Sequence, residues 1–299
     1  MLDYKALTSL QAVVKFQSFD KAAQYLNLTQ SAVSQNIKRL ELHYGNPLLI
    51  RARPVVPTAL GEQLIAHLNK VTILEEGLQE DIQGKTASHP LTIAVNNDVL
   101  ATWFLDVVHQ FSSNNSTKLH ITSADQANTR ALLQTGEVIA CLSQVGTPVA
   151  GGDSLFLGYM DYELVATPAF IEHYLQGDIS AQNVLQSPSL IYDAQDELWT
   201  RYQNECLNIK PDISHSHWYP SSYGFVELVM GGTVCALVAS IQVKEELQNG
   251  QLISLFPQNK LALPLYWHWY KLNSPVLDRL RKVIFTVSQA YLHKSHLSK

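Results

Sequence analysis

The stretch FDKAAQYLNLTQSAVSQNIKRLELHYG, residues 19–45, contains two short helical patterns, 20–26 and 30–43, separated by a polar break. Apolar side chains of the second pattern recur at the spacing of a helix that is buried along one side: Ala32, Val33, Ile37 and Leu40. Thr29 or Gln30 stands where a side chain would satisfy the free amides of the first helical turn. The stretch therefore predicts a helix–turn–helix pair whose second helix has one buried and one polar face.

The polar face of this second helix carries amides, hydroxyls and cations, and its first acid is Glu41. Short polar side chains near a helix N-terminus can reach base edges in the major groove of DNA, and cations further along can hold phosphate. An ordinary solvated helix face is the alternative interpretation. We expect contacts to double-stranded DNA from Gln30, Ser31, Ser34, Gln35, Lys38 and Arg39.

A short apolar run at 47–51 is followed by a segment, 52–58, that contains two prolines in four residues. Proline excludes a regular helix, so this segment is predicted to form a turn or small wing that carries Arg51 and Arg53. A wing beside a helix–turn–helix commonly lies along the DNA backbone or in the minor groove, where arginine is favoured. A plain connector with two solvated arginines is the alternative.

Charge is distributed unevenly along the chain. The whole sequence of 299 residues has 21 basic and 26 acidic residues and a net charge of −5, yet residues 1–60 hold seven Lys or Arg and only three Asp or Glu. The first 60 residues therefore carry +4, and the remainder carries −9. A basic N-terminal segment followed by an acidic remainder is expected where only the N-terminal segment contacts phosphate.

The length of the chain favours more than one domain. We expect a DNA-binding domain over 1–58, a long helix over 59–83 and a hinge over 84–90. Apolar residues along the long helix recur every three or four positions in one narrow seam, which is typical of a dimerising helix. The seam residues that we expect to contact a second copy are Leu64, Leu68, Val71 and Leu78.

From residue 91 onward, strand patterns alternate with helix patterns in two halves of similar size, with strands expected at 155–160 and 163–166 where the halves meet. This predicts an α/β domain with lobe I over 91–163 plus 267–299, lobe II over 164–266, and a cleft between them. Ligands of open α/β sheets lie beyond the carboxyl ends of strands and at helix N-termini. The candidate ligand-binding residues are Asn96, Asn97, Asp98, Thr102, Asp125, Ser143, Gln144, Asp161, Ser221 and Ser222.

Several classes of protein are disfavoured. No apolar run approaches the ~20 residues that span a bilayer, and the N-terminus does not resemble a signal peptide, so we expect a cytoplasmic protein with no membrane partner. Cys141, Cys206 and Cys235 favour free thiols. His215 and His217 have no third ligand near them in the sequence, so we expect no metal. The common catalytic and cofactor motifs are absent, and neither a cofactor nor an enzyme is expected.

Residues 22–49, AAQYLNLTQSAVSQNIKRLELHYGNPLL, with PTALG at 57–61, resemble the DNA-binding segment of LysR-type transcriptional regulators. The body of the chain resembles the arginine/lysine-exporter regulator branch of that family. The segments that carry this likeness are AVNNDVLATWFL (94–105), TGEVIACLS (135–143), LGYMDYELVATPAFIEHY (157–174), SSYGFVELVMGGTVCALV (221–238) and LYWHWY (265–270).

The resemblance implies a winged helix–turn–helix domain, a dimerisation helix and a two-lobed effector domain like that of the periplasmic binding proteins. It implies a homodimer or tetramer that binds promoter DNA of an amino-acid export or metabolism gene, with RNA polymerase as a candidate partner. The implied effector is L-lysine or L-arginine, held between the lobes.

A desolvated ligand cation must be paired with a carboxylate. Asp98 and Asp125 are the acids that we expect to pair with it, and Asp161 is a third candidate. An Asx-turn or a helix cap is the alternative role for each acid. A solute-binding receptor, or a LysR-type regulator with a different effector, remains the alternative function.

Overall fold

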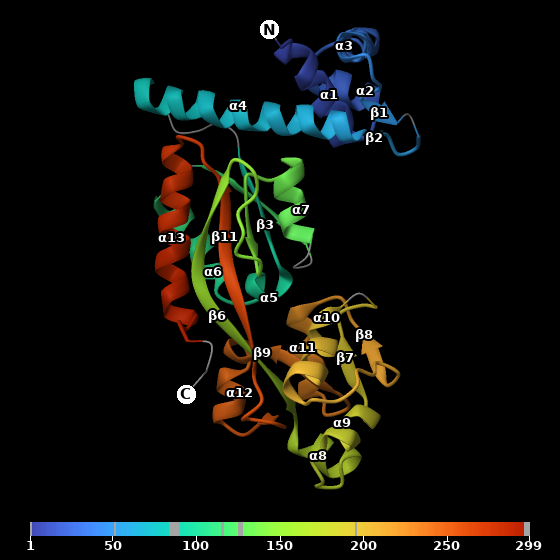
Figure 1. Cartoon of the computed structure of the whole chain (residues 1–299), viewed down its shortest axis with the longest axis vertical. Coiled ribbons are helices and arrows are strands. Elements are labelled where there is room, and N and C mark those ends of the chain that lie inside the picture. Colours follow the sequence, from blue (N-terminus) through green and yellow to red (C-terminus); the bar gives the residue numbers. More distant parts are fainter. Residues whose placement is uncertain are drawn as a thin grey trace.

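The computed structural model describes residues 2–50, 52–83, 90–114, 117–124, 128–194 and 196–295. Three helices and a hairpin form the N-terminal domain: α1 (Tyr4–Phe16), α2 (Phe19–Leu26), α3 (Gln30–Tyr44), β1 (Leu49–Ile50) and β2 (Val56–Pro57). One long helix, α4 (Ala59–Gln83), follows this domain and crosses one end of the α/β domain (Figure 1).

The turn between α2 and α3 forms as its residue types predict. Asn27 ends α2 in the left-handed conformation, with φ of 52°, which asparagine tolerates better than most residues. Thr29 then caps α3, because its side chain accepts a hydrogen bond from the amide of Ala32 at 3.2 Å. Val33 and Ile37 are fully buried against α1 and α2. The predicted winged helix–turn–helix is confirmed.

The α/β domain is built on one nine-stranded sheet in the order β4-β3-β5-β11-β6-β9-β7-β8, with β10 beside β6. Its strands are β3 (Leu91–Val95), β4 (Leu119–Ser123), β5 (Ala140–Ser143), β6 (Gly152–Ala166), β7 (Ser189–Ile191), β8 (Ser216–Trp218), β9 (Cys235–Ala239), β10 (Ile253–Ser254) and β11 (Leu261–Tyr270). Its helices are α5 (Asn97–Leu100), α6 (Phe104–Asn114), α7 (Asn128–Thr135), α8 (Pro168–Tyr174), α9 (Ala181–Gln186), α10 (Glu197–Arg201), α11 (Ser222–Met230), α12 (Lys244–Gln248) and α13 (Pro275–Tyr291), with a π-helical turn at Tyr202–Cys206 and a 3₁₀ turn at Ser240–Gln242.

The long strands β6 and β11 pair antiparallel and join the two lobes (Figure 1). The expectation of two strands at 155–160 and 163–166 is wrong, because β6 is one strand of 15 residues that contains a bulge and no turn. Gly158 permits this bulge, since its φ of +147° is rarely adopted by residues with a side chain. The register pairs Tyr162 with Leu261. We therefore propose that the chain returns to lobe I near residue 261, earlier than the expected boundary at 266.

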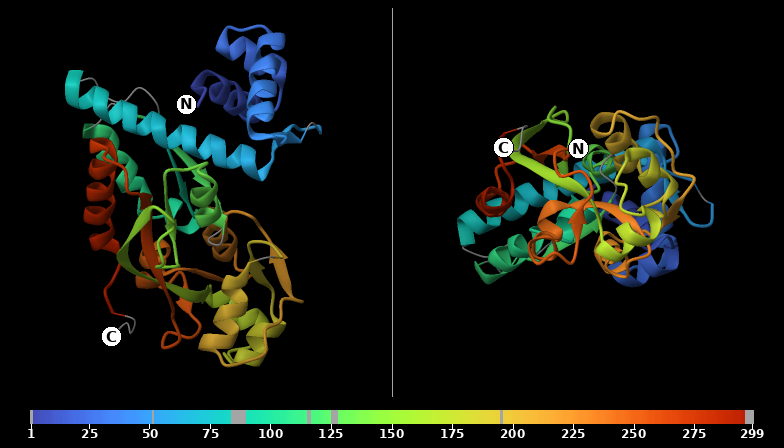
Figure 2. Two further views of the ribbon diagram at one scale, coloured as in Figure 1. Left: turned by 45° about the horizontal axis from the view of Figure 1, so that its top comes forward. Right: turned by 90° about the horizontal axis from the view of Figure 1, so that it is seen from below.

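Helices cover both faces of lobe I. Helices α6 and α13 pack together in one apolar cluster with the sheet, while Leu133 of α7 packs with Cys141 in a separate cluster. Figures 1 and 2 show lobe I between α4 and lobe II, so lobe II lies at the far end from the N-terminal domain. None of the helices in the described ranges combines the length and apolar composition that a bilayer crossing requires.

The expected seam of α4 divides into two parts. Leu64 and Leu68 are only 7% and 6% exposed, because they complete the apolar core of the N-terminal domain of the same chain. Their assignment to a dimer contact is therefore corrected. Val71 is half-buried, whereas Leu78 is 59% exposed. The large apolar side chains that are exposed on the described part of α4 therefore lie in its C-terminal half.

Candidate DNA-binding surface and inter-lobe cleft

The outer face of α3 presents most of the side chains that were predicted to contact DNA. Gln30, Ser31, Gln35 and Lys38 are exposed, and Ser34 is half-buried between them. In the wing, Arg53 is exposed, whereas Arg51 lies outside the described residues. The arrangement places short polar side chains near the start of α3 and a cation further along, as a major-groove reader requires.

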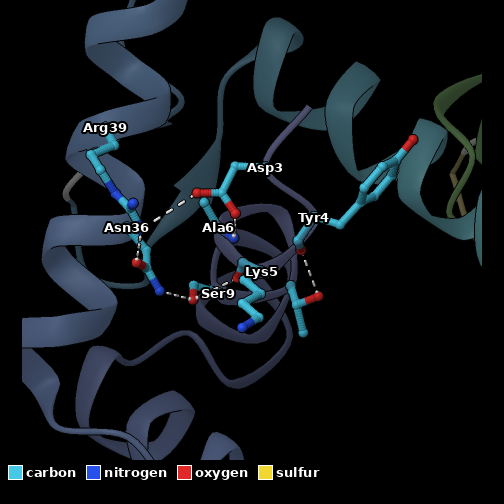
Figure 3. A network of polar contacts seen from close by, with 8 residues as sticks. Asp3, Tyr4, Lys5, Ala6, Ser9, Asn36 and Arg39 are labelled. Carbon is cyan, nitrogen blue, oxygen red and sulfur yellow. Dashed lines mark hydrogen bonds and ion pairs between the residues drawn. The ribbon is translucent and has the colours of Figure 1, made fainter. Parts of the chain in front are cut away.

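Arg39 has a different environment (Figure 3). Its guanidinium donates a hydrogen bond to Oδ1 of Asn36 at 2.5 Å and lies 3.4 Å from the carboxylate of Asp3, at the start of α1. Asn36 in turn donates through Nδ2 to the hydroxyl of Ser9 at 2.8 Å, and Ser9 donates to the carbonyl of Lys5. This network ties α3 to α1. The contact of Arg39 with phosphate stays a prediction, since its side chain is 62% exposed.

A cleft of about 750 Å³ opens between the two lobes. Its lining comes from the residues that follow β3, β5 and β7, and from the starts of α5, α10 and α11. Side-chain hydrogen bonds between described residues cross it from lobe to lobe: Asn97 Nδ2 donates to Tyr192 Oη at 2.7 Å, Ser222 Oγ to Asp98 Oδ1 at 2.5 Å, and Arg201 Nη1 to Gln144 Oε1 at 3.1 Å. Polar side chains therefore link the two lobes across the cleft.

Carboxylates outnumber cations in this cleft. Among its described lining residues, four are acids, Asp98, Asp193, Asp196 and Glu197, and the single Lys or Arg is Arg201. Burial raises the pKa of Asp196, against the hydrogen bonds from the amides of Tyr192 and Leu198, and the nearby charges of Asp98 and Asp193 raise it further. A cation in the cleft would relieve this repulsion.

The structure brings five of the predicted ligand residues to the cleft: Asn96, Asn97, Asp98, Gln144 and Ser222. Of the five other predicted residues, three carry hydroxyls that make local hydrogen bonds instead. Thr102 donates to the carbonyls of Asp98 and Val99, Ser143 accepts from the amide of Val145, and Ser221 caps α11. None of these three side chains belongs to the described lining.

The two remaining acids cannot be assigned to the cleft. Asp125 lies outside the described residues. Asp161 accepts a hydrogen bond from His293 at 2.8 Å on the outer side of β6, because side chains of a strand alternate between its faces. The next residue, Tyr162, lies on the opposite face of the strand, where it donates to the cleft residue Asp98 at 2.7 Å.

Three acids of lobe II line the cleft but were not among the ligand-binding residues predicted from the sequence. Asp193, Asp196 and Glu197 follow the carboxyl end of β7, as Asn96 follows that of β3. The strand-end rule that selected Asn96 would therefore also have selected the run YDAQDE at 192–197. No comparable signal identifies Arg201, because its place depends on how α10 packs across the cleft.

Comparisons with known proteins agree with this architecture. The family described as "Bacterial regulatory helix-turn-helix protein, lysR family" matches residues 4–62. The HTH-type transcriptional regulator ArgP of Pseudomonas fluorescens (strain Pf0-1) is 37% identical over 295 residues, which cover 98% of this chain and 99% of that protein.

Two solved structures are similar over nearly the whole chain. ArgP from Mycobacterium tuberculosis has a TM-score of 0.86 at 28% identity, covering 99% of this chain and all of that one. Full-length LysG from Corynebacterium glutamicum, with bound effector Arg, has a TM-score of 0.77 at 28% identity and covers 98% and 100%.

The fold and surfaces define a DNA-binding protein with a winged helix–turn–helix head and a two-lobed effector domain. The chain belongs to the LysR family of bacterial helix–turn–helix regulators, and its relatives place it in the ArgP/LysG branch. It is a transcriptional regulator and not an enzyme.

Proposed function

We propose that this regulator binds a basic amino acid, L-arginine or L-lysine, between its lobes and changes its DNA contacts in response. The observation that carries the proposal is the excess of carboxylates in the cleft, four against one guanidinium among the described lining residues. A cation that leaves water needs a paired charge, whereas a neutral ligand would leave these acids repelling one another. The bound arginine of LysG supports the same ligand class.

The DNA contacts of the proposal come from α3 and the wing. Gln30, Ser31, Ser34 and Gln35 would reach base edges, because short polar side chains at the start of a recognition helix do so. Lys38 and Arg53 would contact phosphate, and we retain Arg51 in this role from the sequence. We also propose that the DNA-binding domain covers residues 1–58, that the long helix covers 59–83 and that a hinge covers 84–90.

The exposed stripe on the C-terminal half of α4 is the proposed dimer contact. Leu74, Leu78 and Ile82 are 42%, 59% and 71% exposed and follow one another at four-residue spacing. Two copies joined here would present two DNA-binding heads. Ligand binding would shift the population of lobe arrangements and thereby the spacing of the two DNA contacts.

A thermal-shift titration tests the ligand class. Arginine, lysine, histidine and neutral amino acids are compared, because a ligand at 100 times its dissociation constant adds about 2.7 kcal/mol to stability, enough to raise the midpoint by several degrees. We expect shifts with arginine or lysine only, and smaller ones in Asp193→Asn. Glu245→Gln, at an exposed acid of α12 outside the cleft, is the control. A shift with a different class of compound would replace the effector and keep the DNA-binding role.

A further inference from the structure

Asn96 is a buried amide in the cleft with unused hydrogen-bonding capacity. It is 4% exposed, and neither its Nδ2 nor its Oδ1 has a hydrogen-bond partner among the residues that the structure describes. Gln144 is similar, since its Nε2 is buried without a partner in the described ranges while its Oε1 accepts from Arg201. An unpaired buried amide costs stability, so these groups point to a ligand that pairs with them.

The two amides lie at neighbouring strand ends. Strands β3 and β5 are adjacent and parallel, with Ile93 opposite Ala140 and Ala94 opposite Cys141. Continuing that register past both strand ends places Asn96 beside Ser143 and the Gln144 that follows it. The two amides therefore belong to neighbouring strand ends, whose backbones lie about 4.8 Å apart, and both line the same cleft.

Three of the four acids in the described cleft lining come from lobe II, and the fourth, Asp98, comes from lobe I. Gln144 is held by Arg201, so the donor pair has a guanidinium beside it. The acids Asp193, Asp196 and Glu197 all come from the loop of lobe II that follows β7. An amino acid with a cationic side chain has a matching polarity, with a carboxylate at one end and a cation at the other.

We propose that Asn96 and Gln144 bind the α-carboxylate of the effector, and that Oδ1 of Asn96 accepts from its α-ammonium. This inference rests on the proposed function, because it assigns the orientation of a basic amino acid in that cleft. The side-chain cation then lies toward the acids of lobe II. Asn96 would thus select amino acids over the corresponding diamines, which lack the carboxylate.

Isothermal titration with arginine and agmatine, which is arginine without its α-carboxylate, tests the assignment on the full chain. Asn96→Ala is expected to weaken arginine binding by about tenfold to a hundredfold, the range for hydrogen bonds to a charged group. Agmatine binding should weaken less, because agmatine keeps the ammonium that Oδ1 of Asn96 accepts from but lacks the carboxylate. Asn96→Asp puts a negative charge where the carboxylate is expected, so it should abolish arginine binding and strengthen agmatine binding. Asn204→Ala, at an exposed asparagine outside the cleft, is the matched control.

The outcomes separate the two proposals. Arginine binding that persists in Asn96→Ala, or an equal loss of arginine and agmatine, would overturn the assignment of Asn96 while the proposed effector stands. Failure of Asn96→Asp to reverse the preference between the two ligands would also overturn it. A wild-type protein that binds neither arginine, lysine nor agmatine would reject the proposed effector itself.

Discussion

At the scale of single residues, hydrogen bonds from neighbouring side chains hold the residues of the cleft and of the proposed DNA-binding surface. Both oxygens of Asp98 accept hydrogen bonds, from Tyr162 and from Ser222. On α3, Asn36 stands between Arg39 and Ser9. Functional side chains are commonly fixed by such second contacts, and each contact can be tested separately from the surface that it supports.

Asp196 predicts a pH dependence of effector binding. Its pKa in the folded chain is raised, first by burial and then by Asp98 and Asp193. The folded state therefore holds this proton more tightly than the unfolded state, and the free energy of unfolding falls as the pH rises from about 3.9 through the raised value. A bound cation favours the ionised form, so arginine affinity should rise over the same window. Titration calorimetry between roughly pH 4 and pH 7 checks this.

Asp196→Asn is the comparison for this pH dependence, because asparagine does not titrate and keeps an acceptor for one of the two backbone amides that bind Asp196. The variant should bind arginine more weakly and with a flatter pH profile. An unchanged pH profile in Asp196→Asn would assign the dependence to the other acids of the cleft.

Asn36→Ala is expected to loosen α3. The variant loses hydrogen bonds to Ser9 and Arg39, so the free energy of unfolding should fall by about 1–2 kcal/mol and DNA affinity should fall with it, while arginine affinity stays unchanged. Gln35→Ala removes an exposed neighbour and should reduce DNA affinity at wild-type stability. Equal stability of the two variants in denaturant titrations would argue against the network.

At the scale of elements, boundaries set by capping chemistry could be predicted from the sequence. Helix α3 begins after Thr29 and ends at Tyr44, just before Gly45, and α4 covers 59–83 as expected. Elements whose extent depends on pairing with distant strands could not be predicted from the sequence. The single strand β6 requires β11 and β9 as partners, and the face on which Asp161 lies follows from that pairing. Likewise, Leu64 is buried because the N-terminal domain packs on α4. The spacing of apolar residues in α4 cannot distinguish such a contact within the chain from a contact with a second copy.

Leu78→Glu is expected to disrupt the dimer without unfolding the chain. Leu78 is 59% exposed, so a charge there costs the monomer little but opposes an apolar contact between copies. Sedimentation analysis should show a lighter species, with weaker DNA binding. Ile179→Glu, at an exposed apolar residue of lobe II, is the control. Leu68→Ala should instead lower stability by about 2–5 kcal/mol, because Leu68 is buried within the chain. A dimer that survives Leu78→Glu would place the contact elsewhere.

At the scale of the whole molecule, α7 connects the effector cleft with the DNA-binding domain. Its first residue, Asn128, lines the cleft. Beyond its last residue, Gly136 packs so closely on Ala66 of α4 that a Cβ at Gly136 would lie 2.1 Å from that of Ala66. The carbonyl of Gly136 accepts from Asn69 Nδ2 at 2.7 Å, and Asn69 Oδ1 accepts from Gln11 of α1 at 2.6 Å. Asn69 therefore contacts lobe I and the N-terminal domain simultaneously.

This arrangement predicts that Asn69 transmits the effect of the ligand. Asn69→Ala should reduce the factor by which saturating arginine changes DNA affinity, a factor that is typically 5- to 150-fold in allosteric proteins. Arginine affinity without DNA should change little, because Asn69 lies outside the cleft lining. DNA titrations with and without arginine measure the factor, and arginine titrations with and without DNA must return the same value, since coupling is reciprocal. Glu75→Ala, at an exposed residue of the same helix, should keep the wild-type factor. If Asn69→Ala keeps it as well, the coupling runs through other contacts of α4 with lobe I, such as Lys70 over the ring of Tyr270.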